Sequence, residues 1–347
     1  MSYHNTFMAR CLYLARLGGS FTAPNPMVGA VVVCDGKIIG EGYHRRYGEA
    51  HAEPNAIHSV KDKSLLKKST LYVNLEPCSH YGKTPPCADL IVRMGIPRVV
   101  IATLDPNPKV SGRGVQILEK AGVKVEIGIL ADEARRLNRR FFCFQEKKRP
   151  FVTLKWAQTA DGFIDRNRKE ATEPALQISN AVTQQFTHKM RSENMAIMVG
   201  ATTALLDNPS LTLRYWHGHS PLRVAIDRKG LIPENYRLKN GEQPTVIFTE
   251  TPRENRPNVE YVLLKPEEDN LKEILHRFYL KNIHSVLVEG GAKLLQSFID
   301  ADLWDEANVE ISTDEIGAGV KVPTLKNAEI EFEKNIENHR WIHYRLG

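Results

Sequence analysis

The chain has 347 residues, of which 42% are hydrophobic and 25% charged, and these values predict two ordinary globular domains and exclude collagen-like, low-complexity and disulfide-scaffold proteins. Its 47 Lys and Arg against 41 Asp and Glu give a net charge of +6, which suits an anionic small molecule and only weakly supports nucleic-acid binding. No apolar stretch approaches the roughly 20 residues that span a bilayer, and the N-terminus lacks a signal-peptide pattern, so we expect a cytoplasmic protein.

The first 150 residues alternate between strand-like and helix-like patterns. An Asp-Gly turn between two apolar runs predicts a hairpin over residues 29–42. Apolar periodicity then predicts helices at 52–60, 88–94, 114–122 and 131–145, and strands at 70–75, 97–103 and 123–129. This alternation predicts a mainly parallel sheet that helices cover on both faces.

A charged stretch that ends in proline, Glu146–Pro150, indicates a boundary between two domains. We therefore expect a first domain at 1–146, a linker at 147–150 and a second domain at 151–347. In the second half the pattern predicts strands at 151–157, 196–199, 222–227, 245–249 and 285–288, and helices at 181–191, 271–280 and 292–299. Both halves are thus predicted to be α/β domains.

Three residues of the first half have the side-chain chemistry that zinc prefers. His51 opens a predicted helix, Cys78 follows a predicted strand, and Cys87 begins the next helix. One nitrogen and two thiolates suit Zn²⁺ and leave a fourth position for water. Glu53, beside the metal, would move protons from that water to departing ammonia. His-x-Glu with Pro-Cys is the pattern of zinc deaminases, although their cysteines are usually separated by two residues and here by eight.

Two other interpretations stay open on these residues alone. A nucleic-acid or free-nucleoside deaminase would need stacking aromatics and a basic groove near the zinc, and Tyr81 and Lys83 are the only such residues of the insert. A scaffold with a structural zinc would need a fourth ligand, for which His80 is available. The remaining cysteines have no such partners, and we expect core or surface thiols at Cys11, Cys34 and Cys143.

The second half contains a weaker signal for a nucleotide site. Glu289, Gly290 and Gly291 follow an apolar strand and precede a helix, which would free backbone N–H groups for a dinucleotide phosphate. The Gly-x-Gly-x-x-Gly fingerprint is absent from both halves, so a plain tight turn remains an alternative.

Several motifs together resemble the bifunctional deaminase/reductase family of riboflavin biosynthesis. They occur in the family's order at Pro24–Ala30, His51–Glu53, Pro77–Cys87, Asp105–Pro108, Ser111–Gly114, Leu154–Ala157, Asp161–Gly162, Arg191, Gly200–Thr203, Asp207–Pro209, Leu211–Arg214 and Val288–Gly291. The long insert between the cysteines is this family's own variant. The resemblance implies a cytidine-deaminase-like three-layer α/β/α domain, then a dihydrofolate-reductase-like α/β domain, with Zn²⁺ and NADPH as cofactors.

The resemblance also implies roles for residues of the first domain. It places the zinc ligands at His51, Cys78 and Cys87 and the proton shuttle at Glu53. The residues that would line the pocket for the pyrimidine and the ribose phosphate are Asn25, His44, His80, Lys83, Asp105 and Asn107. Lys83 would contact the phosphate, and Asp105 and Asn107 equally fit a Pro-rich turn.

In the second domain the implied contacts are with cofactor and substrate. The residues that would contact NADPH are Ala157, Gln177, Thr203, Asp207, Gly291, Ala292, Lys293, Leu294, Leu295, Gln296 and Ser297. Those that would contact the reductase substrate are Ala175, Arg191, Leu211, Arg214 and Glu289. The two arginines have the fork geometry that binds phosphate. Gln177 stands where the family commonly has tryptophan, so the segment before it departs from the family pattern.

The resemblance implies a two-step enzyme. The first domain would hydrolyse an amino group from 2,5-diamino-6-ribosylamino-4(3H)-pyrimidinone 5′-phosphate, and the second would use NADPH to reduce the ribosyl group to ribityl. We therefore expect a phosphorylated pyrimidine as the partner, with no nucleic acid and no membrane. The resemblance also suggests a homo-oligomer.

Overall fold

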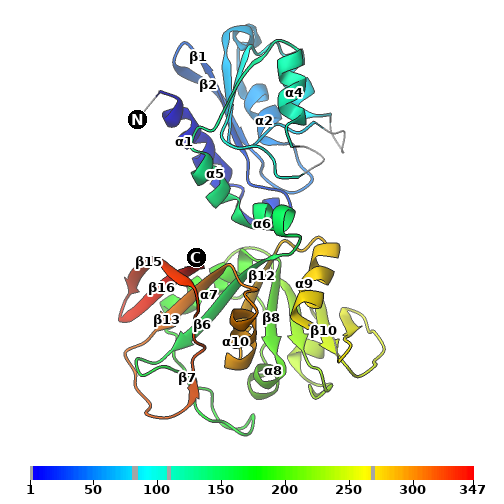
Figure 1. Cartoon of the computed structure of the whole chain (residues 1–347), viewed down its shortest axis with the longest axis vertical. Helices are drawn as coiled ribbons and strands as arrows, with labels where there is room; N and C mark the ends of the chain where they lie inside the picture. Colours follow the sequence, from blue (N-terminus) through cyan, green and yellow to red (C-terminus); the bar gives the residue numbers. More distant parts are fainter. Residues whose placement is uncertain (1–2, 80–84, 108–110, 267–269) are drawn as a thin grey trace. The chain divides into compact units, whose positions relative to one another are not determined.

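The computed structural model describes residues 3–79, 85–107, 111–266 and 270–347 (Figure 1). The chain divides into two units, Met1–Lys148 and Arg149–Gly347. This division falls within the stretch where the sequence suggests a linker. Each unit has its own sheet and its own apolar cores, so each is described by itself.

The first unit contains a five-stranded sheet in the order β2-β1-β3-β4-β5. Its strands are β1 (Gly29–Cys34), β2 (Lys37–Tyr43), β3 (Thr70–Val73), β4 (Arg98–Ile101) and β5 (Lys124–Ile127). The predicted hairpin is confirmed, and Asp35 and Gly36 adopt the positive φ values of 48° and 74° that a two-residue turn between strands favours. β3, β4 and β5 are parallel, whereas β1 is antiparallel to both of its neighbours.

The helices of the first unit differ from the prediction at two places. They are α1 (Tyr3–Arg16), α2 (Ala52–Ser59), α3 (Cys87–Arg93), α4 (Arg113–Lys120), α5 (Ala131–Leu137) and α6 (Arg139–Lys147), with short 3-10 turns at Gly19–Thr22 and Lys63–Lys68. The sequence did not indicate α1. The single helix predicted over 131–145 is wrong, because Asn138 interrupts it with φ −104° and ψ 23°. Its amide side chain instead bonds the backbone N–H and C=O of Met27, at 2.8 and 2.9 Å.

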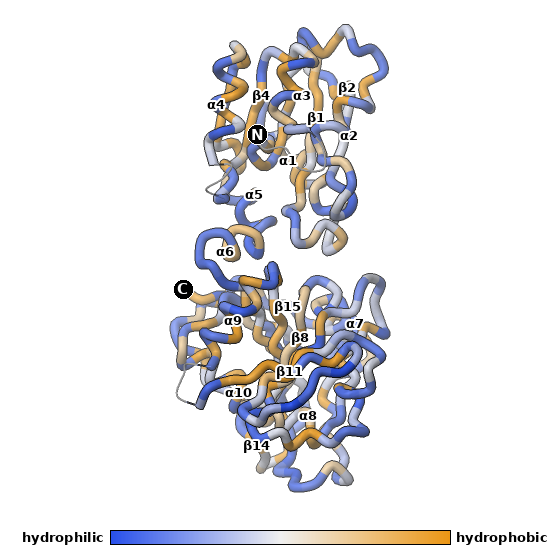
Figure 2. Tube along the Cα trace, turned by 90° about the vertical axis from the view of Figure 1, so that its right-hand side faces the viewer, coloured by the Kyte–Doolittle hydropathy of each residue, from blue (hydrophilic) through white to orange (hydrophobic). Residues whose placement is uncertain are grey.

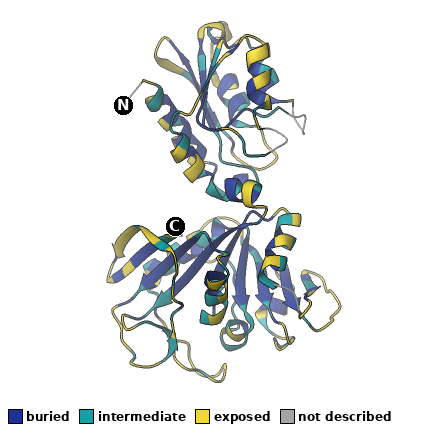
Figure 3. Cartoon of the chain, in the orientation of Figure 1, coloured by how far each residue is buried: buried dark blue, intermediate teal, exposed yellow. Residues whose placement is uncertain are grey.

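Alternate residues of β1 belong to different cores. Ala30 and Val32 pack with side chains from α2, α3 and α4, whereas Val31 and Val33 pack with side chains from α1 and α5. This alternation follows from the two-residue period of a strand. Helices therefore cover both faces of the sheet, which confirms the predicted three-layer α/β/α domain, and the buried strands lie between partly exposed helices (Figure 3).

The second unit contains a nine-stranded sheet in the order β11-β10-β9-β8-β12-β6-β13-β16-β15. Its strands are β6 (Phe151–Gln158), β8 (Ala196–Gly200), β9 (Leu222–Ile226), β10 (Thr245–Thr249), β11 (Val259–Leu263), β12 (Ser285–Gly290), β13 (Glu306–Ile311), β15 (Ala328–Ile336) and β16 (His339–Leu346). The strands from β11 to β13 are parallel, and β16 is antiparallel to β13 and β15. A separate pair joins β7 (Phe163–Asp165) to β14 (Val320–Lys321).

Apolar side chains cover both faces of this second sheet. Its helices are α7 (Ala181–Ser192), α8 (Ala201–Asp207), α9 (Asn270–Leu280) and α10 (Ala292–Asp300), with a 3-10 turn at Arg237–Lys239. Figure 2 shows the apolar stretches of both units along the chain.

The sequence predicted the central parallel strands of the second unit but not β7, α8, β11 or the strands after residue 300. In the described parts of the chain, no helix has the length and hydropathy that crossing a membrane requires.

Candidate active sites

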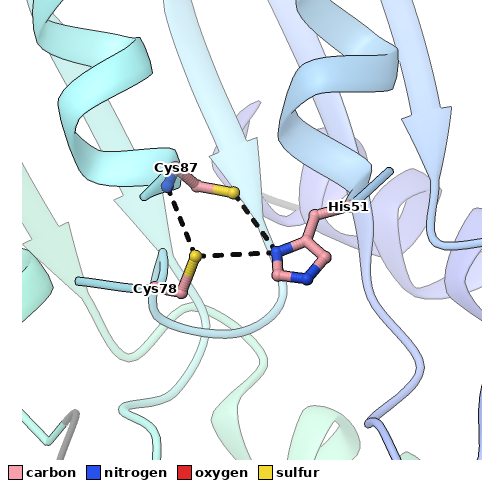
Figure 4. A group of neighbouring side chains, drawn as sticks. All are labelled: His51, Cys78 and Cys87. Atoms are coloured by element: carbon pink, nitrogen blue, oxygen red, sulfur yellow. Dashed lines mark hydrogen bonds between the residues drawn. The ribbon is translucent and has the colours of Figure 1, made fainter. Parts of the chain in front are cut away.

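Three potential metal ligands meet at the N-terminal ends of two helices (Figure 4). His51 is the N-cap residue of α2, Cys87 is the first residue of α3, and Cys78 lies in the loop after β3. His51 Nδ1 lies 3.4 Å from Cys87 Sγ and 3.6 Å from Cys78 Sγ. A tetrahedral zinc with bonds of about 2.0 to 2.3 Å places its ligand atoms roughly 3.5 Å apart, so these side chains fit a zinc ion. Over the described ranges, this metal-ligand group has these three members.

Glu53 lies in the first turn of α2 with only 3% of its surface exposed. Burial, and then the charge of Cys78, raise the pKa of Glu53 to about 7. Hydrogen bonds from Cys87 and His51 lower the pKa of the Cys78 thiol to about 4, against the effect of burial. The site thus combines a thiolate suited to a metal with a buried carboxyl group suited to proton transfer.

Glycine in β2 lets the ligand-bearing helix lie directly on the sheet. A Cβ atom at Gly42 would lie 2.3 Å from the backbone nitrogen of Ala56 in α2. No side chain can be accommodated at that distance, so the strand needs glycine where the helix backbone approaches. This contact fixes the position of α2, and with it the positions of His51 and Glu53.

The structure brings two of the predicted pocket residues to the metal ligands. His44 Nδ1 lies 3.1 Å from the carbonyl oxygen of Ala50, and its Nε2 lies 3.2 Å from Asn25 Nδ2. Because a carbonyl accepts, Nδ1 carries the proton and Nε2 accepts from the amide. Burial lowers the pKa of His44, in keeping with a neutral ring. The ring also packs edge-on against His51, with 5.4 Å between centroids.

Asp105 and Asn107 form a turn in the described structure. Asp105 Oδ1 accepts the backbone N–H of Asn107 at 2.8 Å, as aspartate commonly does in turns. His80 and Lys83, the other two predicted pocket residues, lie outside the described residues.

Glu76, which no sequence pattern singled out, is a buried carboxylate beside the metal site. It is 4% exposed and lies two residues before Cys78. Its Oε2 accepts the backbone N–H groups of Asp105 and Gly112 at 3.2 and 3.0 Å, and its Oε1 accepts that of Gly114 at 2.9 Å. The glutamate thus ties the Asp105 turn and the start of α4 to the metal-binding segment. A charged residue between an apolar strand and Pro-Cys was the available signal.

In the second unit, Arg191 of α7 forms a buried ion pair with Glu289 of β12. Its Nε and Nη2 donate to the two carboxylate oxygens at 2.7 and 2.6 Å. Burial raises the pKa of Glu289, but the charge and hydrogen bonds of Arg191 outweigh that effect and lower it. Arg191 Nη1 also donates to the carbonyl of Thr212 at 3.2 Å. Two of the predicted substrate residues are therefore bound to each other.

The other predicted substrate residues have different environments. Arg214 is exposed and donates from Nη1 to Ser210 Oγ at 2.5 Å. Leu211 is 3% exposed and belongs to an apolar core. Ala175 lies exposed in the segment between β7 and α7.

A buried polar cluster, which no sequence motif indicated, lies on the face of the sheet that α7 covers. Lys155 of β6 and Glu310 of β13 are 6% and 0% exposed, with Nζ and Oε2 3.6 Å apart. Glu310 accepts hydrogen bonds from Ser179 Oγ at 2.6 Å and from His339 Nδ1 at 2.7 Å. The charge of Lys155 also contributes to lowering the pKa of Glu289. A lysine inside an otherwise apolar strand was the signal.

Three groups of predicted NADPH residues lie at the carboxyl edge of the parallel strands. β6 and β8 both pair in parallel with β12, so Ala157, the start of α8 and the start of α10 lie at one edge. Gly291 has φ +75°, and a Cβ there would lie 3.2 Å from Thr203 Oγ1. This contact brings α8 and α10 together. Leu295 is 1% exposed and belongs to the core.

Arg168 organises the segment that departs from the family pattern. Its side chain is 4% exposed and forms ion pairs with Asp165 and Asp207. Asp207, a predicted cofactor contact, is thereby joined to that segment. Gln177 is exposed and donates from Nε2 to the carbonyl of Ser179 at 2.8 Å.

The chain matches two family models. Residues 1–103 match the cytidine and deoxycytidylate deaminase zinc-binding region, which includes the three metal ligands. Residues 150–335 match the RibD C-terminal domain. The first unit is therefore a zinc-binding deaminase domain and the second a reductase domain.

Proteins with these two domains resemble the chain over nearly its whole length. The riboflavin biosynthesis protein RibD of Aquifex aeolicus is 39% identical over 344 residues, which cover 96% of this chain and 94% of the relative. That of Bacillus amyloliquefaciens is 41% identical, over 93% of this chain and 88% of the relative.

Solved structures agree with these relatives. The crystal structure of a diaminohydroxyphosphoribosylaminopyrimidine deaminase/5-amino-6-(5-phosphoribosylamino)uracil reductase from Thermotoga maritima is 39% identical, with a TM-score of 0.90 over 99% of both chains. RibD of Acinetobacter baumannii is 30% identical, with a TM-score of 0.88 over 99% of both chains. With Zn²⁺ and NADPH as its cofactors, this chain belongs to the RibD family, the bifunctional deaminases and reductases of riboflavin biosynthesis.

Proposed function

We propose that the first unit deaminates 2,5-diamino-6-ribosylamino-4(3H)-pyrimidinone 5′-phosphate and that the second reduces the ribosyl group of the product to ribityl. The observation that carries the first step is the meeting of His51, Cys78 and Cys87 beside the buried carboxyl group of Glu53. Three ligands that leave one position open are typical of a catalytic zinc rather than of a structural one. The substrates named in the two activities of the Thermotoga maritima relative support this choice.

In the deaminase site, His51, Cys78 and Cys87 would hold the zinc, which supplies a Lewis acid that activates water. Glu53 accepts a proton from the attacking water and delivers it to the amino group, which leaves as ammonia. Asn25 donates to His44 beside these ligands, and the two side chains would contact the substrate together. Asp105 and Asn107 complete the substrate contacts, together with His80 and Lys83 from outside the described residues.

In the reductase site, the second unit would hold NADPH, whose chemistry when bound would be hydride donation to the sugar carbon of the open-chain substrate. The protein would bind the cofactor at the carboxyl edge of the sheet, through Ala157, Thr203, Asp207 and the first turns of α10. The N–H groups before the first intrahelical bond of α10, which Leu295 donates to Gly291, would face its phosphates. Gln177 would contribute from the segment that Arg168 holds, and Leu295 fixes α10 in the apolar core. The substrate lies against Ala175, Leu211, Arg214 and the pair formed by Arg191 and Glu289.

The test follows ammonia release and NADPH oxidation separately in the purified protein. We expect Glu53→Gln to lower deamination by about 10² to 10⁴-fold, because it removes the proton carrier. Reduction of pre-deaminated substrate should stay unchanged. Glu119→Gln on the exposed side of α4 is the matched control and should alter neither activity. Full deaminase activity in Glu53→Gln, or no NADPH oxidation by the wild type, would refute the corresponding assignment.

We also propose that the partner is this small phosphorylated pyrimidine and that neither nucleic acid nor a membrane is bound. The protein would act in the cytoplasm and form a homo-oligomer. The two-domain resemblance to the RibD relatives supports these assignments. Light scattering coupled to size-exclusion chromatography gives the oligomeric state, and a monomeric mass would refute that assignment.

A further inference from the structure

His188 of α7 accepts hydrogen bonds from the chain segment that carries Arg214. The histidine is 3% exposed. Its Nδ1 lies 3.0 Å from the backbone nitrogen of Arg214 and 3.5 Å from that of Tyr215, and its ring packs edge-on against the Tyr215 ring at 4.8 Å. Because a backbone N–H can only donate, Nδ1 has no proton, and the neutral ring carries its proton on Nε2.

The surroundings of His188 keep it in this acceptor form. Burial, and then the charges of Arg191 and Arg214, lower the pKa of His188 to about 4, while Glu289 opposes this effect and Lys155 adds to it. The imidazole therefore remains an acceptor near neutral pH. Its position among these charges also places it at the proposed substrate site.

Helix α7 holds this segment at two points. His188 binds the amide of Arg214, and Arg191, three residues further along the same helix face, donates to the carbonyl of Thr212 at 3.2 Å. Leu211 fixes the start of the segment in the apolar core. The backbone that carries Arg214 is therefore held by the buried side chain of Leu211 and by hydrogen bonds to His188 and Arg191, both from α7.

The two arginines differ in the donors that they have left. Arg191 uses three of its five N–H groups, Nε and Nη2 on Glu289 and Nη1 on Thr212, and Glu289 neutralises its charge. Within the described ranges, the exposed side chain of Arg214 donates one hydrogen bond, from Nη1 to Ser210. Arg214 thus retains the N–H groups that a bidentate contact with phosphate requires.

We infer that His188 is a positioning residue of the reductase, which holds Arg214 in place to bind the phosphate of the substrate. The inference rests on the proposed reductase function, in which Arg214 contacts the phosphate of the substrate. His188 itself touches the backbone of Arg214, so its effect on the substrate passes through that arginine.

The experiment compares the pre-deaminated substrate with its dephosphorylated form in the full-length enzyme. His188→Leu removes the acceptor and should raise KM for the phosphorylated substrate at least about tenfold, the equivalent of one charge-assisted hydrogen bond. KM for the dephosphorylated form, kcat and NADPH binding measured by fluorescence should change less than about twofold. A merely structural role would weaken both substrates equally, and that outcome would overturn the inference.

Two further variants test the position of the acceptor. Asn places an oxygen near the Nδ1 position, whereas Gln places it near Nε2, so His188→Asn should keep the wild-type preference for phosphate and His188→Gln should lose it. His284, a buried histidine at the opposite end of β12 from Glu289, is the matched control, and His284→Leu should keep the preference. Equal preference in His188→Asn and His188→Gln would overturn the inference. A wild type that shows no preference for phosphate would instead refute the proposed substrate.

Discussion

The metal site of the first unit is built from residues between His51 and Cys87, whereas the candidate reductase residues extend from Lys155 to Glu310. The metal ligands come from the ends of two helices and one loop, where the N–H of Cys87 donates to Cys78 Sγ and buried Glu76 accepts the N–H of Gly114. The reductase site instead depends on long-range pairs such as Arg191 with Glu289 and Lys155 with Glu310. A compact ligand set can be recognised as a motif, and a dispersed set of ion pairs cannot.

Metal removal should give the largest difference between the two units. Dialysis against a chelator is expected to abolish ammonia release, because His51, Cys78 and Cys87 supply the only metal-ligand group found in the described ranges. NADPH oxidation on pre-deaminated substrate should persist. Re-addition of zinc should restore the first activity. A parallel loss of both activities would show that the second unit depends on the metal as well.

The buried pair of the second unit should dominate its stability. Glu289→Gln leaves Arg191 buried with an unpaired charge and should lower the free energy of unfolding by about 3 kcal/mol. All four tryptophans of the chain lie in the second unit, so urea unfolding followed by tryptophan fluorescence reports on this unit alone. The control is Glu273→Gln, which breaks the more exposed pair with Arg277 and should cost less than about 0.5 kcal/mol. Equal losses of unfolding free energy in Glu289→Gln and Glu273→Gln would contradict the larger contribution assigned to the buried pair.

In the first unit, Glu76→Gln should have a smaller and more local effect. The amide keeps one acceptor oxygen but turns an NH2 group towards two backbone N–H groups, at a cost of about 2 kcal/mol. Amide hydrogen exchange at Asp105, Gly112 and Gly114 should accelerate, and KM for the deaminase substrate should rise, while zinc content is kept. Asp62→Asn, at an exposed cap that accepts the N–H of Ser64, is the control. Unchanged exchange at all three amides would contradict the assigned contacts.

Acidification should destabilise the second unit through His188. The pKa of His188 is about 4 in the folded chain, against an ordinary value of 6.5. Between these two values the unfolded chain binds more protons than the folded chain, so the free energy of unfolding decreases as the pH is lowered. The contribution is complete above about pH 6.5 and amounts to a loss of at most about 2 kcal/mol at pH 5. Arg191, Arg214 and Lys155 lower this pKa, and Glu289 opposes them. In His188→Asn the decrease between pH 7 and pH 5 should be smaller, and an identical decrease would contradict the neutral ring.

The sequence-based predictions succeeded where a pattern is local. The hairpin at 29–42, the central parallel strands and the helix that starts after His51 are confirmed. The prediction of a continuous helix over 131–145 is wrong because the Asn138 side chain forms hydrogen bonds with the backbone of Met27, which is distant in the sequence. β15 and β16 were missed because both mix charged with apolar residues, and only β15 is an edge strand.

The sequence alone indicated the candidate metal ligands and the family resemblance, because both depend on residue types at short spacings, and it indicated the two α/β halves from the alternation of strand and helix patterns. Only the tertiary structure paired Arg191 with Glu289, buried Glu76 beneath the Asp105 turn and placed His188 against the amide of Arg214. These contacts join segments that are distant in the chain, and burial makes them strong by removing competing water. Residue type and spacing do not show which buried groups meet, so this part of the site became visible only with the fold.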